Sequence, residues 1–222
     1  MSDYTLTFIL SSDATFSSGD GVAGSIDREV EHDVDGLPYL RGRTLKGLLR
    51  EASDNVLDSL RAIGKPDIAE WEESQTALFG LSSAEERRPG IIHFGHAMLP
   101  EGLRQVVHQA VVDSSLSPQD VLDSLTAVRR QTANNAQGLP VDGSLRTMRV
   151  VLRKTKFAGR LHCRRDLSGN EEALLAAAVL AWNRAGTGRN RGRGKLQADL
   201  LDSDGNSIAH QGYKAFIAEP ES

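Results

Sequence analysis

Gly186-Thr-Gly-Arg-Asn-Arg-Gly-Arg-Gly-Lys195 is the stretch at which this chain passes from a helix to a strand. The segment before it, 168–185, begins with a capping box and is rich in alanine and leucine, which predicts a buried helix. Residues 195–201 alternate in polarity like a strand. Glycine lets a ligand approach main-chain N–H groups, and arginine carries a planar fork of donors that matches a phosphate. The stretch therefore predicts a loop that binds a polyanion, with a solvated basic turn as the alternative.

Two familiar glycine motifs do not fit this loop. A Walker loop requires glycine where Arg189 stands and serine or threonine where Leu196 stands. A dinucleotide-binding fingerprint runs from a strand into a helix, whereas here the helix comes first. The loop therefore follows the negative end of a helix dipole. A phosphate there would be held by arginine side chains and loop amides.

The composition narrows the class of protein. A chain of 222 residues with 39% hydrophobic residues fits one domain with an insertion. Cys163 is the single cysteine, which excludes a disulfide framework and a cysteine-rich zinc site. Aromatic residues make up 5%, which argues against base stacking as the main recognition mode. We find no signal peptide and no apolar run of membrane length, so we expect a cytoplasmic protein without a membrane partner.

The distribution of charge is more informative than its total. The formal net charge is −4, which by itself argues against a nucleic-acid partner. Three long segments nevertheless contain basic residues and no acid, namely 36–50, 143–165 and 173–198. Such segregation is typical of a protein with one basic face, as in nucleic-acid binding.

The order of the expected elements indicates the fold class. Strand, helix and strand are followed by an insertion, a strand pair joined by a short turn, a helix and a final strand. This order predicts an α+β fold, a ferredoxin-like or RNA-recognition-motif-like sandwich with an inserted thumb. The expected strands are 4–10, 91–99, 145–152, 156–163 and 195–201, and the first helix begins near Thr44.

The first helix carries cations at the end where they are unfavourable. Arg43, Lys46 and Arg50 line one of its faces, and each opposes the helix dipole by about a few tenths of a kcal/mol. A bound phosphate would offset this repulsion, because helix N-termini attract anions. The alternative is a solvated face paired with acids such as Glu51.

Two further segments are expected to have structural roles. Residues 64–90 are polar and acidic, with Trp71 and the run 78–80 as local anchors. His93 and His96 have a spacing that occurs in metal sites, but a strand would put them on opposite faces, so we expect structural roles.

Several segments together resemble one known family. Asp35-Gly-Leu-Pro-Tyr-Leu-Arg-Gly-Arg-Thr-Leu-Lys-Gly-Leu-Leu-Arg50 resembles the Pro-Tyr-Ile-Pro-Gly-Ser-Ser-Leu-Lys-Gly segment of the RAMP superfamily, the RNA-binding proteins of CRISPR systems. Residues 186–195 resemble the C-terminal glycine-rich loop of that family, and 78–80 and 152–160 also fit its pattern. Arg41 and Arg43 replace the usual proline and first serine, which makes this end more basic.

Within the superfamily, the chain is most similar to the Csm/Cmr-type backbone subunit of type III effector complexes. The resemblance implies one RAMP-like domain over 1–222, with insertions at about 11–34 (the loop bearing Asp27), 64–90 (lid-like) and 113–145 (the thumb). It implies several copies stacked along a guide crRNA, beside other CRISPR effector subunits. The thumb would push between the guide and the complementary target RNA, with Leu139, Pro140 and Val141 as its insertion tip.

The resemblance also implies site residues. Asp27 follows Gly24 and Ser25 at the position where the slicing members carry their aspartate, so it is the candidate catalytic residue and metal ligand. The cofactor implied is a divalent metal, Mg²⁺ or Mn²⁺, with no organic cofactor. The RNA-binding candidates are Arg41, Arg43, Lys46, Arg50, Arg129, Arg130, Gly188, Arg189, Arg191, Gly192, Arg193, Gly194 and Lys195.

RNA cleavage by attack of its own 2′-hydroxyl requires in-line geometry, charge neutralisation and proton transfer. Asp27 could hold a hydrated metal or accept the proton. No second carboxylate stands at clear ligand spacing, although Asp20 and Asp33 are nearby helpers in sequence. The alternative is a loop aspartate that caps backbone N–H groups.

Two other functions stay open at this point. The chain could be a non-catalytic subunit that holds RNA in the same kind of complex. It could instead be a stand-alone crRNA-processing endoribonuclease, which would need a histidine near the RNA, and only His32 lies beside a suitable loop.

Overall fold

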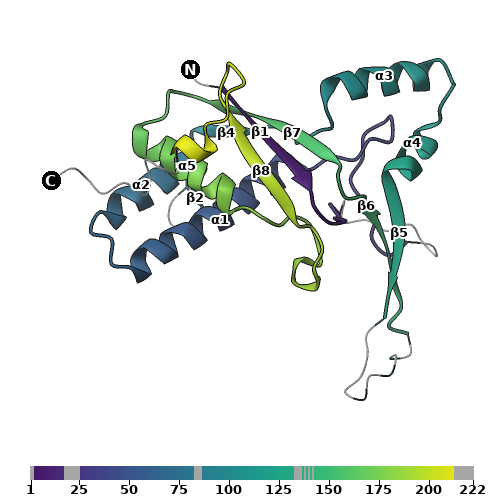
Figure 1. The fold of residues 1–222 in the computed structure, drawn as a ribbon, viewed down its shortest axis with the longest axis horizontal. Helices are drawn as coiled ribbons and strands as arrows, with labels where there is room; N and C mark the ends of the chain where they lie inside the picture. The colour runs from purple at the N-terminus through teal and green to yellow at the C-terminus, as the bar shows by residue number, and fades with distance from the viewer. Residues whose placement is uncertain are drawn as a thin grey trace.

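A four-stranded antiparallel sheet forms the centre of the computed structural model, which describes residues 3–17, 26–82, 87–132, 137, 139, 141 and 143–212. The strands lie in the order β4 (Ile92–Phe94), β7 (Lys156–Cys163), β1 (Asp3–Leu10) and β8 (Leu196–Leu201). Helices α1 (Gly42–Ala62) and α5 (Gly169–Ala181) pack together on one face of this sheet (Figure 1). None of the described helices is long and apolar enough to cross a membrane.

The topology confirms the predicted fold class. Along the chain, the sheet strands and the two helices follow the order β1, α1, β4, β7, α5, β8, which is the ferredoxin-like arrangement. β1 lies between β7 and β8, so that Leu6 is opposite both Gly159 and Leu200. Because side chains alternate along a strand, Leu6, Phe8 and Leu10 are all buried towards the helices.

Helix α5 lies at the centre of the molecule. Residues 173–179 are all buried, because this helix packs on β8, α1 and α2 and has no polar side to present to water. The predicted capping box is present between Ser168 and Glu171, whose carboxylate also receives two hydrogen bonds from Arg165 at 2.6 and 2.7 Å. The helix ends at Ala181, earlier than predicted. Trp182 turns into the core there and donates to the carbonyl of Arg184 at 2.9 Å.

The lid-like insertion expected over 64–90 is instead part of the helical layer. It contains helix α2 (Ile68–Phe79) and two short paired strands, β2 (Gly80–Ser82) and β3 (Arg87–Pro89). Trp71, Leu78 and Phe79 are buried, and α2 packs against α1 and α5. The acidic composition of this segment hid the apolar face, which these three side chains supply at helical spacing.

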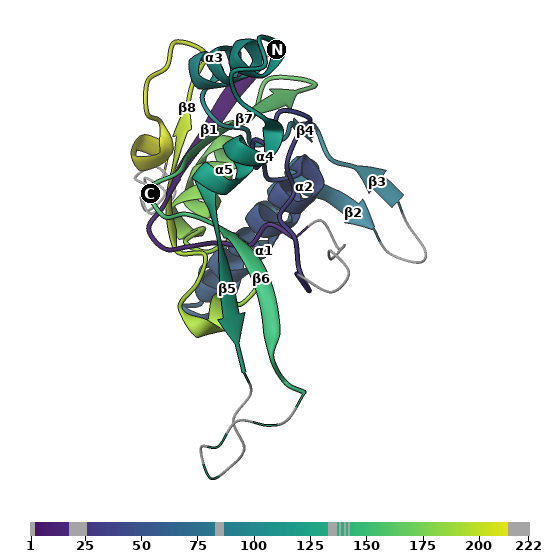
Figure 2. The same cartoon turned by 90° about the vertical axis from the view of Figure 1, so that its right-hand side faces the viewer.

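Two further helices lead to the hairpin of the thumb: α3 (Glu101–Val112), which buries no side chain, and α4 (Pro118–Leu125), which buries Val121 and Leu122. Strands β5 (Thr126–Gln131) and β6 (Arg146–Val151) pair with each other from Thr126–Val151 to Gln131–Arg146. The resulting hairpin extends away from the sheet and the helices (Figure 2).

This pairing corrects the sequence-based prediction. We expected the strand at 145–152 to form a hairpin with the strand at 156–163, but β6 pairs with β5, and β7 pairs with β1 and β4. The chain separates the two strands at Lys154, which has a φ of +70°. Helix α4 ends at Leu125, where the hydroxyl of Thr126 donates to the carbonyl of Leu122 at 2.6 Å and Thr126 starts β5.

The thiol of Cys163 provides a test of this core. It lies fully buried on β7, and burial raises the pKa of the thiol to about 11. Because the thiolate is the reactive form, we expect alkylation at pH 8 to be at least about 100-fold slower in the native protein than after unfolding in urea. The matched control is Gln197→Cys in a Cys163→Ala background, which places a thiol on the exposed side of β8 and should react at the rate of a free thiol. Rapid alkylation of native Cys163 would contradict the packing of β7.

Candidate nucleic-acid interface

The glycine-rich loop is held in a left-handed backbone conformation at four positions. A single turn of 3₁₀ helix, η1 (Arg189–Arg191), lies between Gly188 (φ +76°) and Gly192 (φ +79°). Gly186 and Gly194 also have positive φ, which glycine adopts without the steric cost that other residues incur. The loop therefore has a defined shape that depends on its glycines.

Contacts with neighbouring backbone fix the two ends of the loop. A Cβ at Gly194 would overlap the carbonyl oxygen of Ala185, and one at Gly186 would lie 2.5 Å from the carbonyl oxygen of Thr15. Gly194 N–H donates to the carbonyl of Asp13 at 2.9 Å, and Thr187 N–H donates to that of Thr15 at 3.0 Å. No atom lies within 4 Å of the corresponding Cβ position at Gly192, so the middle of the loop is open to a ligand.

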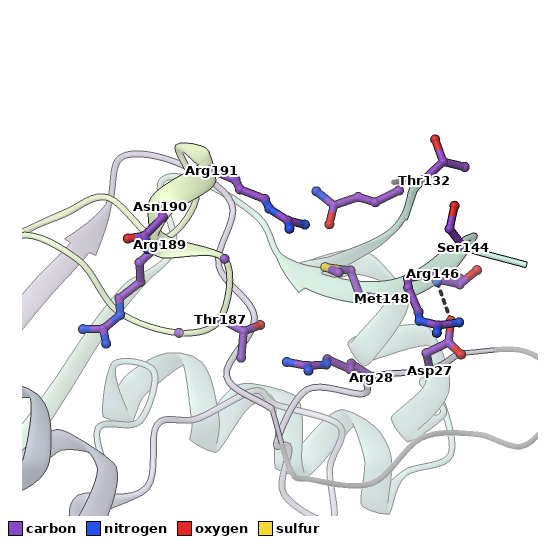
Figure 3. Close-up of a pocket in the computed structure, with 14 residues that line it drawn as sticks. Asp27, Arg28, Thr132, Ser144, Arg146, Met148, Thr187, Arg189, Asn190 and Arg191 are labelled. Atoms are coloured by element: carbon purple, nitrogen blue, oxygen red, sulfur yellow. Dashed lines mark hydrogen bonds between the residues drawn. The ribbon is translucent and has the colours of Figure 1, made fainter. Parts of the chain in front are cut away.

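The arginines of the loop point in three directions. Arg189 reaches α1, where its guanidinium binds both carboxylate oxygens of Glu51 at 2.8 and 3.0 Å. Arg191 is exposed and points toward the hairpin (Figure 3). Arg193 is half-buried and contacts the sulfur of Met148 on β6. The loop thus bridges the first helix and the thumb.

A cavity of about 1310 Å³ lies between the loop and the thumb. It is lined by residues 186–191, by Asp27 and Arg28, and by residues 131, 132, 144 and 146–148 at the outer ends of β5 and β6 (Figure 3). Asp27 is the sole carboxylate among the described residues that line it, and the cationic side chains that line it are Arg28, Arg146, Arg189 and Arg191. This balance suits a phosphate-bearing chain.

Asp27 is held on the thumb by backbone pairing. Its N–H donates to the carbonyl of Thr147 at 2.8 Å, and its carboxylate accepts the N–H of Thr147 at 2.6 Å. Arg28 pairs with Met148 in parallel register, so this segment runs beside β6 like an added strand. Residues 18–25, which include Asp20, Gly24 and Ser25, lie outside the described part of the chain.

A buried arginine anchors this arrangement. Arg149 on β6 is 8% exposed, and its guanidinium binds Glu29 at 3.0 Å, Asp123 at 2.6 Å and Thr126 at 3.1 Å. It thereby joins the Asp27 segment, α4 and the base of the hairpin. The sequence showed Arg149 only as one of many cations in a basic run, and no local signal marks its burial.

The cations of the first helix divide between two sides. Arg43, Gly47 and Glu51 follow one another at four-residue intervals on an exposed ridge, which continues to the glycine-rich loop through Arg189. Gly47 leaves the helix backbone open on this ridge.

Lys46 and Arg50 turn aside from the ridge. Arg50 donates to the carbonyl of Gly80 at 2.7 Å, and burial together with the nearby Arg50 lowers the pKa of Lys46. The structure therefore places Arg43 on the same ridge as Glu51, the partner of Arg189, and leaves Lys46 and Arg50 off this ridge. His96 accepts the N–H of Gly42 at 2.9 Å at the start of α1, which is a structural role.

The remaining candidates are distributed along the thumb and the loop. Arg129 binds Asp13 at 2.9 Å, and Arg130 and Lys195 are exposed. Arg41 binds Glu31 at 2.6 Å. Leu139 and Val141 are exposed, as a tip that inserts between bases requires, and Pro140 lies outside the described residues.

Comparison with known proteins assigns the family. The family model of the RAMP superfamily matches residues 10–197. The chain belongs to the RAMP superfamily. Among curated proteins, none matches it significantly.

Solved structures of similar fold come from CRISPR complexes. A chain of the type III-B Cmr-beta complex bound to cognate target RNA is 13% identical, with a TM-score of 0.63 over 89% of this chain and 96% of that one. A chain of the apo Cmr-beta complex is 14% identical, with a TM-score of 0.61 over 90% of this chain and 97% of that one. A chain of a type IV-B CRISPR complex is 12% identical, with a TM-score of 0.59 over 90% of each.

The described side chains around Asp27 do not by themselves make a metal site. The described residues contain no group of three His, Cys, Asp or Glu side chains placed to hold a metal ion. Arg28 and Arg146 line the same cavity and would repel a cation. Asp33 is occupied in a turn, where its carboxylate accepts the N–H groups of Asp35 and Leu37 at 3.1 and 2.9 Å.

Paired substitutions test how the loop keeps its shape. Both Gly192→Ala and Gly194→Ala place a side chain at positive φ, which costs about 1–2 kcal/mol. Only Gly194→Ala also drives a methyl group into the Ala185 carbonyl, so we expect it to lower the free energy of unfolding by about 3 kcal/mol or more. Urea denaturation of both variants measures the difference. Equal destabilisation would contradict the close contact at Ala185.

Proposed function

We propose that this chain is the crRNA-binding backbone subunit of a type III CRISPR ribonucleoprotein. Several copies stack along the guide beside other effector subunits, and the assembled particle cleaves bound target RNA at regular intervals. The observation that carries the proposal is the cavity of the glycine-rich loop, with its four arginines, open loop backbone and single carboxylate beside a protruding hairpin. Superfamily membership and the fold of the Cmr-beta subunits support it.

The proposed path of the guide follows the exposed ridge of α1 onto the loop. Phosphates contact Arg43 and the open backbone at Gly47, then the amides and arginines between Gly188 and Gly192. These contacts read the sugar–phosphate chain and no base edge, which suits a guide of any sequence. The hairpin then lies across the duplex of guide and target.

The proposed cleavage uses Asp27 as a general base. Its carboxylate accepts the proton of a target 2′-hydroxyl, whose oxygen attacks the adjacent phosphorus. The bond from phosphorus to the 5′-oxygen breaks, and water protonates that oxygen, which leaves a 2′,3′-cyclic phosphate and a 5′-hydroxyl. Arg28 and Arg146 neutralise charge on the phosphate. A divalent metal stays a prediction from family resemblance, and no step is assigned to it.

A non-catalytic RNA-holding subunit of the same kind of complex is the second candidate. The contact that favours it is the 2.6 Å hydrogen bond from Thr147 N–H to the Asp27 carboxylate, which gives this side chain a structural task. A processing endoribonuclease gains no support, because no histidine is among the described residues that line the cavity.

Asp27→Asn separates the two candidates. The amide oxygen can still accept the N–H of Thr147, so the segment keeps its place while the base is lost. In the assembled complex we expect target cleavage to fall by about 10²–10⁴-fold, with guide and target binding within about twofold. Asp33→Asn is the control, because that aspartate caps a nearby turn away from the cavity. Cutting at the wild-type rate would favour the non-catalytic subunit.

Replacement of Arg189, Arg191 and Arg193 by alanine tests RNA binding by the loop. Loss of the phosphate contacts of Arg189 and Arg191 should flatten the plot of log K against log salt by about 1.4 for single-stranded RNA, measured by fluorescence anisotropy on the purified chain. The charge-matched control replaces Lys156, Arg160 and Arg164, which are exposed on β7 or just beyond it. Equal slopes for the two triple variants would remove the loop from the interface.

A further inference from the structure

A second, smaller cavity lies between the glycine-rich loop and α1. Its volume is about 260 Å³, and Gly186, Thr187 and Arg189 line both this cavity and the larger one. Phe16, Leu40 and Leu48 contribute apolar lining. The polar groups that matter here are Glu31, Tyr39, Arg41 and Thr187.

The two carboxylate oxygens of Glu31 in this cavity differ in their hydrogen bonds to the described residues. Oε1 accepts hydrogen bonds from Tyr39 at 2.8 Å and from Arg41 at 2.6 Å, and the Tyr39 bond is the main reason why the pKa of that phenol is raised. Oε2 is buried, and the described residues offer it no hydrogen bond. The side chain is only 10% exposed. A buried polar atom without a partner is unfavourable, and Oε2 finds no donor among the described residues.

Thr187, which also lines this cavity, carries a second orphaned atom. Its Oγ1 is buried without a hydrogen-bond partner in the described part of the chain. The main chain of Thr187 is fixed, because its N–H donates to Thr15 and the preceding Gly186 packs on that residue. The hydroxyl is thus presented by a rigid loop.

We propose that Glu31 Oε2 and Thr187 Oγ1 bind the 2′-hydroxyl of one ribose of the RNA held by the loop. This inference rests on the proposed RNA-binding function and adds a site that distinguishes RNA from DNA. A 2′-hydroxyl is both donor and acceptor, so it donates to the carboxylate and accepts from the threonine hydroxyl. The two orphaned atoms are then satisfied by one ligand atom.

The neighbouring cations favour a ribose over a base. Arg41 and Arg189 line the same cavity, each already near a carboxylate, and can contact phosphates adjacent to the bound sugar. A base-reading pocket would restrict the guide sequence, whereas every ribose carries the same hydroxyl. The Arg41 side chain is 53% exposed, so a phosphate can reach its guanidinium from solvent.

Binding of matched RNA and DNA strands by Thr187→Val tests the site. The substitution keeps the shape of the side chain and removes only the hydroxyl. We expect the wild-type chain to bind a single-stranded RNA more tightly than the all-2′-deoxy strand of the same base sequence, with uracil in both. Thr187→Val should weaken RNA binding by about tenfold and leave DNA binding within about twofold. Thr5→Val, a half-buried threonine on β1 that does not line this cavity, is the matched control and should change neither.

A 2′-fluoro strand isolates Glu31, because fluorine cannot donate to the carboxylate. Glu31→Gln should weaken binding of the ribose strand and leave binding of the 2′-fluoro strand unchanged. Equal loss of RNA and DNA binding in Thr187→Val, or dependence of its effect on base identity, would overturn the inference. Wild-type protein that binds both strands equally would overturn it too but leave the proposed RNA-binding function standing. Wild-type protein that binds neither strand would overturn both.

Discussion

The buried guanidinium of Arg149 is the interaction on which the geometry of the candidate site depends. It binds Glu29 of the Asp27 segment and Asp123 of α4, and so joins these two segments. Both contacts lie where the hairpin leaves the body of the protein. A charge that is 8% exposed is tolerable only because several acceptors surround it. The placement of Asp27 beside the thumb, and of the thumb beside the glycine-rich loop, follows from this one side chain together with the backbone pairing along β6.

Features with a local cause could be predicted from sequence. The alternation of 4–10, the capping box at Ser168 and the glycines of the loop each specify a local conformation, and each appears in the structure as expected. The partner of β6 could not be predicted in this way, because strand pairing depends on which segments the whole fold brings together. Helix α2 was missed because its few buried side chains stand among many acids.

In the candidate site, too, some residues could be predicted from the sequence and others could not. Asp27 and the arginines of the loop were found because their sequence context resembles a family motif, and the structure places Asp27, Arg189 and Arg191 around one cavity. Glu31 and Arg149 carry no such context. Glu31 is identified by its buried oxygen without a partner, and Arg149 by its burial and by its 3.0 Å contact with Glu29, which is far away in the sequence. Lys46 and Arg50 show the converse, since their sequence pattern suggests a ligand, but Arg50 donates to the carbonyl of Gly80 and Lys46 is half-buried.

The isolation of the β5–β6 hairpin from the central sheet has a consequence for how such an arm can vary. Its two strands hydrogen-bond to each other, and the described part of β5 makes no strand pairing with the four-stranded sheet. Residues can therefore be inserted or removed at its outer end without altering the register of the sheet. Because side chains alternate, changes of two residues per strand preserve which face looks inward and alter the reach by about 7 Å. The length of this hairpin is therefore independent of the sheet that carries it.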